Sequence, residues 1–184
     1  MASINTLYGP LSQNLLKQFA KIKILACDVD GVFSDGRIYM GQQGEELKAF
    51  HTRDGYGIKT LQSIGVQVAV ITGRRSNIVE QRMSSLGVKY IIQGCEDKQE
   101  ALADLQKQLG FNHKVTASIG DDVPDLGMFE LSDICFTVND GHPSVKQQAN
   151  YITHNNGGFG AVREVCDLIL LAKGKLNTIN ESST

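Results

Sequence analysis

The sequence predicts an α/β fold, with a doubly wound, Rossmann-like parallel sheet that is flanked by helices. Short runs rich in β-branched residues recur along the chain, and helix-like segments separate them. Such runs are typical of strands that are buried on both faces of a parallel sheet. The 184 residues, 41% of them hydrophobic, have the size and apolar content of one globular unit. We therefore expect a single domain over residues 1–184.

The predicted elements alternate along the chain. Leucine and phenylalanine recur at helical spacing near the start, which predicts a helix over residues 11–20. Strands are expected at residues 22–29, 66–71, 88–92, 115–119 and 134–138. Helices are expected at residues 57–63, 76–86, 98–109 and 125–131. Right-handed crossovers would place the carboxyl ends of all strands at one edge of the sheet, where such folds bind ligands.

Residues 36–50 break this alternation. Two short alternating runs flank Gly41-Gln42-Gln43-Gly44, a pattern typical of a β-hairpin. The segment follows the first strand, so the hairpin should project over the ligand-binding edge. Because loops at such an edge often carry function, we interpret it as a functional flap rather than a decorative loop.

Composition excludes several classes of function. The net charge of −2 leaves no basic excess for nucleic-acid binding. No run approaches the roughly 18 apolar residues of a membrane helix, and the N-terminus lacks the pattern of a secretory signal. Four cysteines without C-x-x-C spacing predict buried, reduced thiols. We therefore expect a cytoplasmic protein with no nucleic-acid or membrane partner, and a polar C-terminal tail over residues 173–184.

Chemically active side chains follow four of the predicted strands. Each has an ordinary interpretation when taken alone, such as a helix cap, a turn or a solvated charge. Their ordered placement at one edge of the sheet favours a common site. In chain order the set is Asp28, Asp30, Thr72, Gly73, Lys98, Asp121, Asp122 and Asp125.

The spacing of the acidic residues indicates phosphate chemistry. Crowded carboxylates raise one another's pKa unless a cation neutralises them, and carboxylate oxygens suit Mg²⁺. Asp28 and Asp30 face the same side of an extended chain, so one can be a nucleophile and the other an acid and base. Gly31 permits a sharp turn near an anion. Thr72 and the Gly73 amide, at an expected helix N-terminus, would donate to phosphoryl oxygens.

This ordered set resembles the motifs of the haloacid dehalogenase superfamily of phosphotransferases. The resemblance covers residues from about 22 to 125 and implies Mg²⁺ as the cofactor. It implies that Asp28 attacks phosphorus to form a phospho-aspartyl intermediate. Asp30 would protonate the leaving alcohol and then activate water.

The same resemblance implies roles for the remaining residues of the set. Mg²⁺ would be held by Asp28, by the backbone carbonyl of Asp30 and by Asp121. Thr72 and Lys98 would hold the phosphoryl oxygens. Two further aspartates would support the metal ligands from behind, namely Asp122 and Asp125.

A second set of motifs extends over nearly the whole chain. The motifs are Asp28-Val29-Asp30-Gly31-Val32, Asp35-Gly36-x-Ile38-Tyr39, Gly44-Glu45-Glu46-x-Lys48-x-Phe50, Asp54-Gly55-x-Gly57-Ile58-Lys59 and Gly157-Gly158-x-Gly160-Ala161-Val162-Arg163-Glu164. Together they resemble a narrower branch of the superfamily, which hydrolyses the 8-phosphate of the eight-carbon sugar acid 3-deoxy-D-manno-octulosonate, a step in lipopolysaccharide precursor synthesis. The resemblance implies a homotetramer without a cap domain, in which the hairpin and C-terminal tail of adjacent subunits close each site.

The implied substrate, a small phosphorylated sugar acid, carries a carboxylate that guanidinium groups would bind in a bidentate fork. Arg74 follows the second motif, and Arg82 lies eight positions later, close to the same helical face. Arg75 and Arg163 are weaker candidates. Residues 157–160 lack the spacing of a dinucleotide fingerprint, so we expect a flexible, exposed tail segment there. With the residues that the resemblance adds, the expected substrate-binding set is Asp30, His51, Thr52, Arg53, Asp54, Gly55, Lys59, Gly73, Arg74, Arg82 and Lys98.

Two alternatives remain open from the sequence. One is the same chemistry on a nine-carbon, sialic-acid-type sugar phosphate, because related phosphatases share these motifs. The other is a non-catalytic, Mg²⁺-binding regulatory module that is phosphorylated on aspartate. Asp30 argues against the module, because a neighbouring general base would destabilise a phospho-aspartate.

Overall fold

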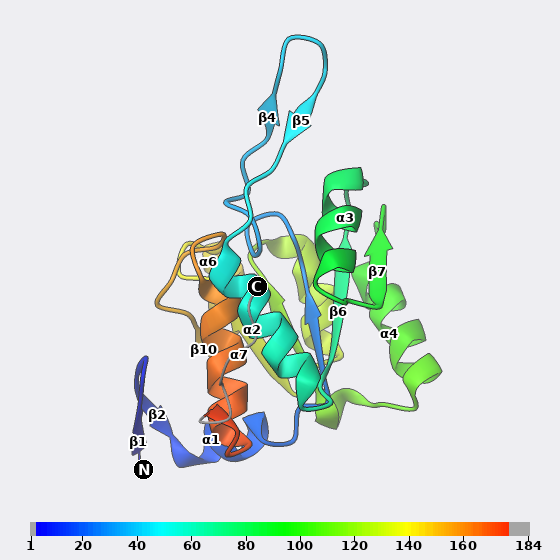
Figure 1. Cartoon of the computed structure of the whole chain (residues 1–184). Helices are drawn as coiled ribbons and strands as arrows, with labels where there is room; N and C mark the ends of the chain where they lie inside the picture. The colour runs from blue at the N-terminus through cyan, green and yellow to red at the C-terminus, as the bar shows by residue number, and fades with distance from the viewer. Residues whose placement is uncertain (1–2, 177–184) are drawn as a thin grey trace.

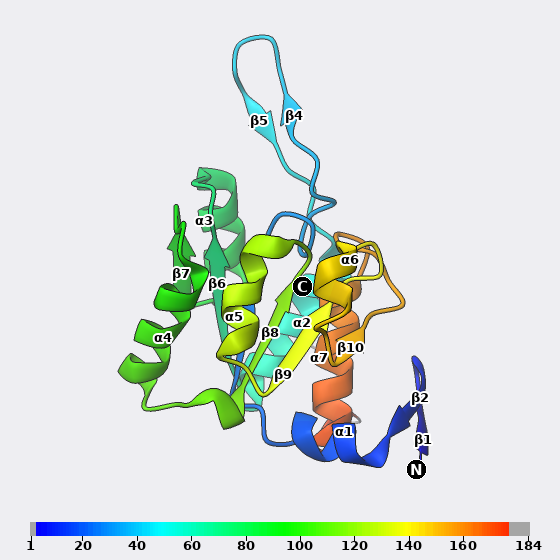
Figure 2. The same ribbon diagram turned by 180° about the vertical axis from the view of Figure 1, so that it is seen from behind.

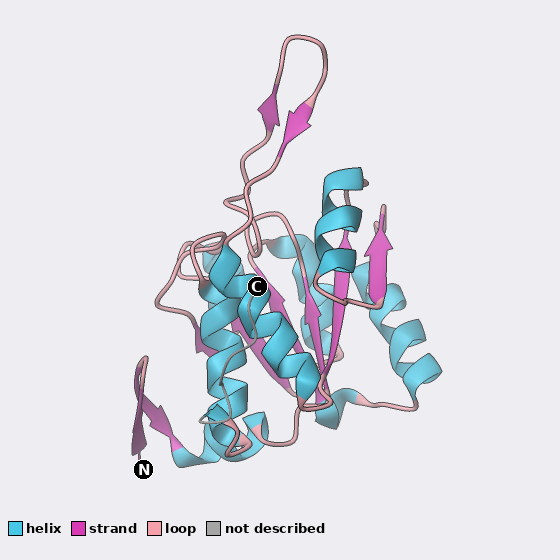
Figure 3. Cartoon of the chain, in the orientation of Figure 1, coloured by secondary structure: helices cyan, strands magenta, loops and turns pink. Residues whose placement is uncertain are grey.

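A computed structural model describes residues 3–176 of the chain (Figure 1). Its centre is a six-stranded parallel sheet in the order β10-β9-β8-β3-β6-β7. Figure 3 shows the strands in magenta and the flanking helices in cyan. The predicted doubly wound α/β fold is confirmed. In chain order, the strands are β3 (Ile24–Cys27), β6 (Gln67–Thr72), β7 (Tyr90–Gln93), β8 (Thr116–Gly120), β9 (Ile134–Thr137) and β10 (Tyr151–Ile152).

Helices cover both faces of this sheet. Helices α2 (Thr52–Ser63) and α7 (Ala161–Ala172) pack together on one face, and α4 (Lys98–Leu109) and α5 (Leu126–Glu130) cover the other (Figures 1 and 2). None of the helices within residues 3–176 has the length and apolar content of a membrane span. The remaining helical elements are α1 (Gln13–Phe19), α3 (Asn77–Ser85), η1 (His113–Val115), η2 (Val123–Asp125) and α6 (Pro143–Lys146).

The helix predicted at residues 57–63 begins five residues earlier, at Thr52. The sequence prediction is wrong there because Gly55 and Gly57 are poor helix formers. Both glycines are buried, and a Cβ atom on Gly57 would lie 3.1 Å from the Cβ of Cys166 on α7. Close packing between the two helices therefore outweighs the low helix propensity.

The N-terminal helix is also shorter than predicted. Strands β1 (Ser3–Thr6) and β2 (Gly9–Ser12) form an antiparallel hairpin that takes up residues 11 and 12. Helix α1 then begins at Gln13, capped by Ser12, whose Oγ accepts a hydrogen bond from the Leu15 N–H at 3.2 Å.

The expected flap is present. Strands β4 (Tyr39–Met40) and β5 (Glu46–Leu47) pair antiparallel and project beyond the carboxyl edge of the sheet (Figures 1 and 2). Gly44 in the connecting turn has a φ of +87°, which favours glycine. The flap thus begins directly above the edge where the predicted site residues lie.

The expectation of a flexible tail at residues 157–160 is wrong. A Cβ atom on Gly157 would lie 1.7 Å from the carbonyl oxygen of Gly31, so this segment packs tightly on the loop after β3. Helix α7, which the sequence analysis did not predict, starts immediately afterwards and is largely buried. Lys173, at the start of the predicted tail, donates to the Ala20 carbonyl at 2.8 Å. Residues 177–184 of that tail lie outside the described residues.

Candidate active site

A cavity of about 510 Å³ opens at the carboxyl edge of the sheet. It brings together one group of the predicted site residues, which come from the ends of β3, β6 and β8 and the start of α4. The lining residues are Asp28, Asp30, Gly36, Thr72, Gly73, Arg74, Cys95, Glu96, Lys98, Asp121, Asp122, Pro124 and Asp125.

Strand register explains why the acids meet. Strands β3 and β8 are parallel neighbours, with Cys27 opposite Ile119. The Asp28 N–H continues this ladder by donating to the Ile119 carbonyl at 3.0 Å. Asp28 and Asp121 therefore leave adjacent strand ends side by side.

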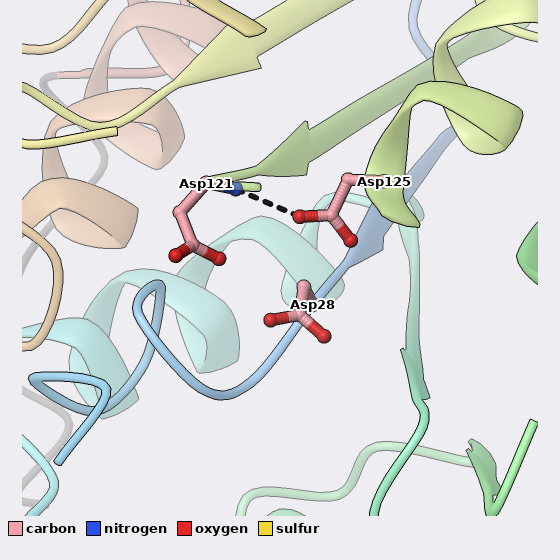
Figure 4. A group of neighbouring side chains, drawn as sticks. All are labelled: Asp28, Asp121 and Asp125. Carbon is pink, nitrogen blue, oxygen red and sulfur yellow. Dashed lines mark hydrogen bonds between the residues drawn. The ribbon is translucent and has the colours of Figure 1, made fainter. Parts of the chain in front are cut away.

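Three carboxylates gather at this point. One oxygen each from Asp28, Asp121 and Asp125 lies within 4.8 Å of the others (Figure 4). Burial, reinforced by the charge of Asp125, raises the pKa of Asp28 to about 7. Burial, reinforced by the charge of Asp28, raises the pKa of Asp121 to about 8. This crowding of hard oxygen ligands fits a divalent cation such as Mg²⁺, which would offset the repulsion.

Lys98 neutralises part of this charge. Its Nζ donates to Asp28 Oδ1 and to Asp125 Oδ1, at 2.6 Å each. Burial alone would lower the pKa of Lys98, but the two carboxylates raise it above its ordinary value. Lys98 is therefore cationic at neutral pH.

The Asp125 carboxylate already accepts hydrogen bonds from groups of the protein. Its Oδ2 accepts the backbone N–H groups of Asp121 at 2.8 Å and Asp122 at 3.1 Å, while Oδ1 accepts from Lys98. These bonds fit the expected supporting role better than direct metal binding, although the carboxylate lies close to Asp28 and Asp121.

Two glycines admit this arrangement. Gly31 has a φ of +89°, and a Cβ atom there would lie 2.1 Å from Asp121 Oδ2. A Cβ atom on Gly120 would lie 2.3 Å from the Cβ of Asp125. Only residues without a side chain leave room for the two carboxylates.

Asp30 connects the site to the hairpin. Its Oδ1 accepts hydrogen bonds from the Ser34 hydroxyl at 3.2 Å and from Lys48. Arg74 Nε lies 3.9 Å from Asp30 Oδ2, and Arg74 Nη2 lies 3.4 Å from Glu46 Oε2. Glu46 and Lys48 were not among the site residues predicted from the sequence. Their spacing of two on an extended segment, which puts both on one face, could have indicated them.

Two local expectations need correction. Thr72 is the last residue of β6, but α3 begins only at Asn77, so Thr72 and Gly73 are not at a helix N-terminus. Cys95 is half-buried and lines the cavity, unlike the other three cysteines, which are buried free thiols as predicted.

The other expected substrate-binding residues do not line this cavity. The group comprises His51, Thr52, Arg53, Asp54, Gly55 and Lys59 on α2 and its cap, and Arg82 on α3.

Two of these residues make contacts within the subunit. Asp54 Oδ1 accepts the Arg163 N–H at 2.8 Å in the first turn of α7. Arg82 lies against Gly55, where a Cβ atom would approach Arg82 Nη2 to 2.5 Å. Arg74 precedes α3, so Arg74 and Arg82 do not share a helical face, contrary to the prediction.

The fold and this set of side chains define a hydrolase of the haloacid dehalogenase type, and a family model described as haloacid dehalogenase-like hydrolase matches residues 90–165. The chain is 47% identical to a protein of Salmonella typhi named 3-deoxy-D-manno-octulosonate 8-phosphate phosphatase, over 96% of this chain and 94% of that one. A relative of the same name from Yersinia pestis is 49% identical over 95% of this chain. The chain therefore belongs to the 3-deoxy-D-manno-octulosonate 8-phosphate phosphatase family.

Solved structures agree with this assignment. A crystal structure of the Yersinia pestis phosphatase has a TM-score of 0.94 and 48% identity, and covers 96% of this chain and 95% of its own. A second is the Moraxella catarrhalis phosphatase in complex with magnesium, phosphate and 3-deoxy-D-manno-octulosonate (KDO). It has a TM-score of 0.87 and 43% identity, and covers 91% of this chain and 97% of its own. Within residues 3–176, this chain has the same fold, and no cap domain is evident.

Proposed function

We propose that this chain is a Mg²⁺-dependent phosphatase that hydrolyses 3-deoxy-D-manno-octulosonate 8-phosphate to the free sugar acid and phosphate. One observation carries the chemistry: Asp28, Asp121 and Lys98 converge in the cavity at the sheet edge, with Asp30 two residues from Asp28. Family membership carries the substrate, because relatives of that name match nearly the whole chain. The reaction supplies a precursor of lipopolysaccharide.

In the first step, Asp28 is the nucleophile. Its carboxylate oxygen attacks phosphorus and forms an acyl phosphate, while the bond from phosphorus to the sugar oxygen breaks. Asp30 gives its proton to that leaving oxygen. Lys98 and Thr72 hold the phosphoryl oxygens, with Lys98 fixed by its bond to Asp125.

In the second step, Asp30 acts as the base. It takes a proton from water, whose oxygen attacks the phosphorus of phospho-Asp28 and releases phosphate. Asp28 and protonated Asp30 are thereby regenerated.

The donor set fits Mg²⁺. Asp28, Asp121 and the backbone carbonyl of Asp30 would hold it, with Asp122 and Asp125 in support. When bound, Mg²⁺ supplies positive charge that lowers the repulsion between the Asp28 carboxylate and the phosphate anion.

Assembly would complete the substrate site. Arg74 lines the cavity and is half-exposed, so it can reach a substrate carboxylate within one subunit. The residues on α2 and α3 that do not line this cavity would act through a homotetramer, in which hairpins and tails of neighbouring subunits close each site. The exposed apolar side chains of the hairpin support such contacts.

A cytoplasmic location completes the proposal. The buried free thiols of Cys27, Cys135 and Cys166 suit a reducing compartment.

Phosphate release tests the function directly. Wild-type protein should hydrolyse the eight-carbon sugar acid phosphate with Mg²⁺ and not with excess EDTA. Asp28→Asn and Asp30→Asn should each lower turnover by at least about a hundredfold while leaving the circular dichroism spectrum unchanged. Wild-type turnover by both folded variants would refute the mechanism. A preference for a nine-carbon sugar acid phosphate would refute the substrate.

A further inference from the structure

The two carboxylate oxygens of Asp30 have different surroundings. Oδ1 accepts from the Ser34 hydroxyl at 3.2 Å and from the Lys48 ammonium group. Oδ2 faces Arg74, whose Nε lies 3.9 Å away, beyond hydrogen-bond distance. Oδ1 is thus held by two donors, Oδ2 accepts no hydrogen bond among the described residues, and Asp30 lines the cavity.

The anchor comes from buried groups. The Lys48 side chain is 2% exposed, and Ser34 is fully buried. A buried ammonium group requires anionic partners, and Lys48 has Asp30 and, at 3.8 Å, Glu46 Oε1. Glu46 also faces Arg74 through its other oxygen. Lys48, at the base of the hairpin, thus connects the hairpin to the carboxylate of Asp30.

We propose that Lys48 is a positioning residue: with Ser34 it holds Oδ1 of Asp30, so that Oδ2 is the oxygen that transfers the proton to the leaving group. This inference rests on the proposed acid and base role of Asp30. An unanchored carboxylate samples several rotamers, and general acid catalysis needs the donor within hydrogen-bond reach of the leaving oxygen. The hairpin thereby contributes to the chemistry through one side chain at its base.

The leaving group provides a sharp test. A sugar alkoxide needs a proton as it leaves, whereas p-nitrophenolate leaves readily without one. The ratio kcat/KM covers steps up to the release of the leaving group, so it excludes the later hydrolysis of phospho-Asp28. We expect Lys48→Met to lower kcat/KM for the sugar acid phosphate by about tenfold to a hundredfold. For p-nitrophenyl phosphate the ratio should change by no more than about threefold.

Three further variants complete the experiment. Lys48→Arg keeps a cationic donor and should recover most of the lost activity, whereas Ser34→Ala removes the other donor and should show the same substrate dependence with a smaller loss. Arg37→Ala, which removes an exposed hairpin cation whose partner is Asp35, is the matched control and should behave as wild type.

Each remaining outcome counts against the proposal. An equal loss of kcat/KM on both substrates in Lys48→Met would show a general structural role, and no loss on either would show no role. If Lys48→Met does not fold, an equal loss on both substrates in Ser34→Ala refutes the anchoring of Oδ1. Failure of the proposed function itself would look different, because the wild type would then not hydrolyse the sugar acid phosphate.

Discussion

At the scale of single residues, the site depends on charges that the fold crowds together. Asp28 and Asp121 come from neighbouring strand ends, and burial raises the pKa of each. Lys98 bonds to Asp28 and Asp125 but not to Asp121 in the described contacts. The deficit of positive charge explains why a divalent cation fits here.

The raised pKa values predict how Mg²⁺ binding depends on pH. At pH 6, Asp28 and Asp121 hold protons in the metal-free protein, because their pKa values are about 7 and about 8. Mg²⁺ must displace these protons, so its affinity should rise by at least about tenfold between pH 6 and 8.5. Titration calorimetry with Mg²⁺ at both pH values measures this. Asp121→Asn should bind more weakly and depend less on pH, whereas a flat profile in the wild type would contradict the prediction.

Gly31 offers a second prediction at this scale. In Gly31→Ala, the new methyl group would collide with Asp121 Oδ2 and strain a backbone with a φ of +89°. We expect a loss of about 1–3 kcal/mol of stability, and weaker Mg²⁺ binding. Gly44→Ala is the matched control, because Gly44 has a φ of +87° but nothing within 4 Å of a new Cβ. Thermal unfolding should show a smaller loss of stability in Gly44→Ala, which has the backbone strain without the collision, and calorimetry should show impaired Mg²⁺ binding only in Gly31→Ala.

At the scale of elements, the packing of α2 on α7 decides the local structure. Gly57 permits the close approach of the helices, and Asp54 on α2 accepts the Arg163 N–H of α7. Asp54 is 1% exposed, and its Oδ2 has no hydrogen-bond partner. Burial raises the pKa of Asp54 to about 6, against partial compensation by Arg163 and Arg53.

This buried carboxyl predicts a pH-dependent stability. The pKa of Asp54 is about 6 in the fold and 3.8 ordinarily, so the native state binds the proton more tightly. Stability from this group is present below pH 4 and is lost as the pH rises toward 6. Asp54→Asn keeps an oxygen acceptor without the charge, so it does not lose this stability. The unfolding free energy of the variant minus that of wild type should therefore increase by at most about 3 kcal/mol as the pH rises from 4 to 6.

Urea unfolding at pH 4, 5 and 6 measures the difference between the two proteins. The exposed Asp104→Asn is the control and should track the wild type. Parallel curves for wild type and Asp54→Asn would contradict a raised pKa at this position.

At the scale of the whole molecule, the hairpin over residues 36–50 gathers several large apolar side chains that are exposed in the described chain. Met40 and Leu47 are 73% and 68% exposed, and Ile38 and Tyr39 beside them are also exposed. Apolar side chains gathered on a projecting element indicate a contact surface. This supports the proposed tetramer in a fold that has no cap domain of its own.

A charge placed on this surface should prevent assembly. In Met40→Asp/Leu47→Asp, burying two carboxylates between subunits would cost several kcal/mol, so light scattering should report smaller species than for wild type. Turnover of the sugar acid phosphate should fall with assembly, because neighbouring subunits would complete the site in the proposed tetramer. The exposed Gln42→Asp adds a charge to the polar part of the hairpin and should leave both properties unchanged. An unchanged mass for the double variant would contradict the proposed contact.

Much of the fold and one group of site residues could be predicted from short apolar runs in the sequence and from the residues that directly follow them. The apolar runs before Asp28, Thr72 and Gly120 predict strands, and parallel strands bring their carboxyl ends to one edge whatever else the chain does. The start of α2 could not be predicted from neighbouring residues alone. Its glycines are needed because a side chain there would collide with Arg82 or with α7, which are distant in the sequence. The flexible tail expected at residues 157–160 failed for the same reason, since Gly157 packs on Gly31.

The sequence by itself determined five of the six strands of the sheet, without β10, together with the phosphate chemistry and the acids and lysine that line the cavity. These depend on periodicity and on position at strand ends, which neighbouring residues encode. Only the tertiary structure decided that Lys48 reaches Asp30 and that Asp54 bonds to α7, 109 residues away. Such contacts join segments whose mutual position depends on how the helices and the hairpin pack, and no local pattern specifies that packing.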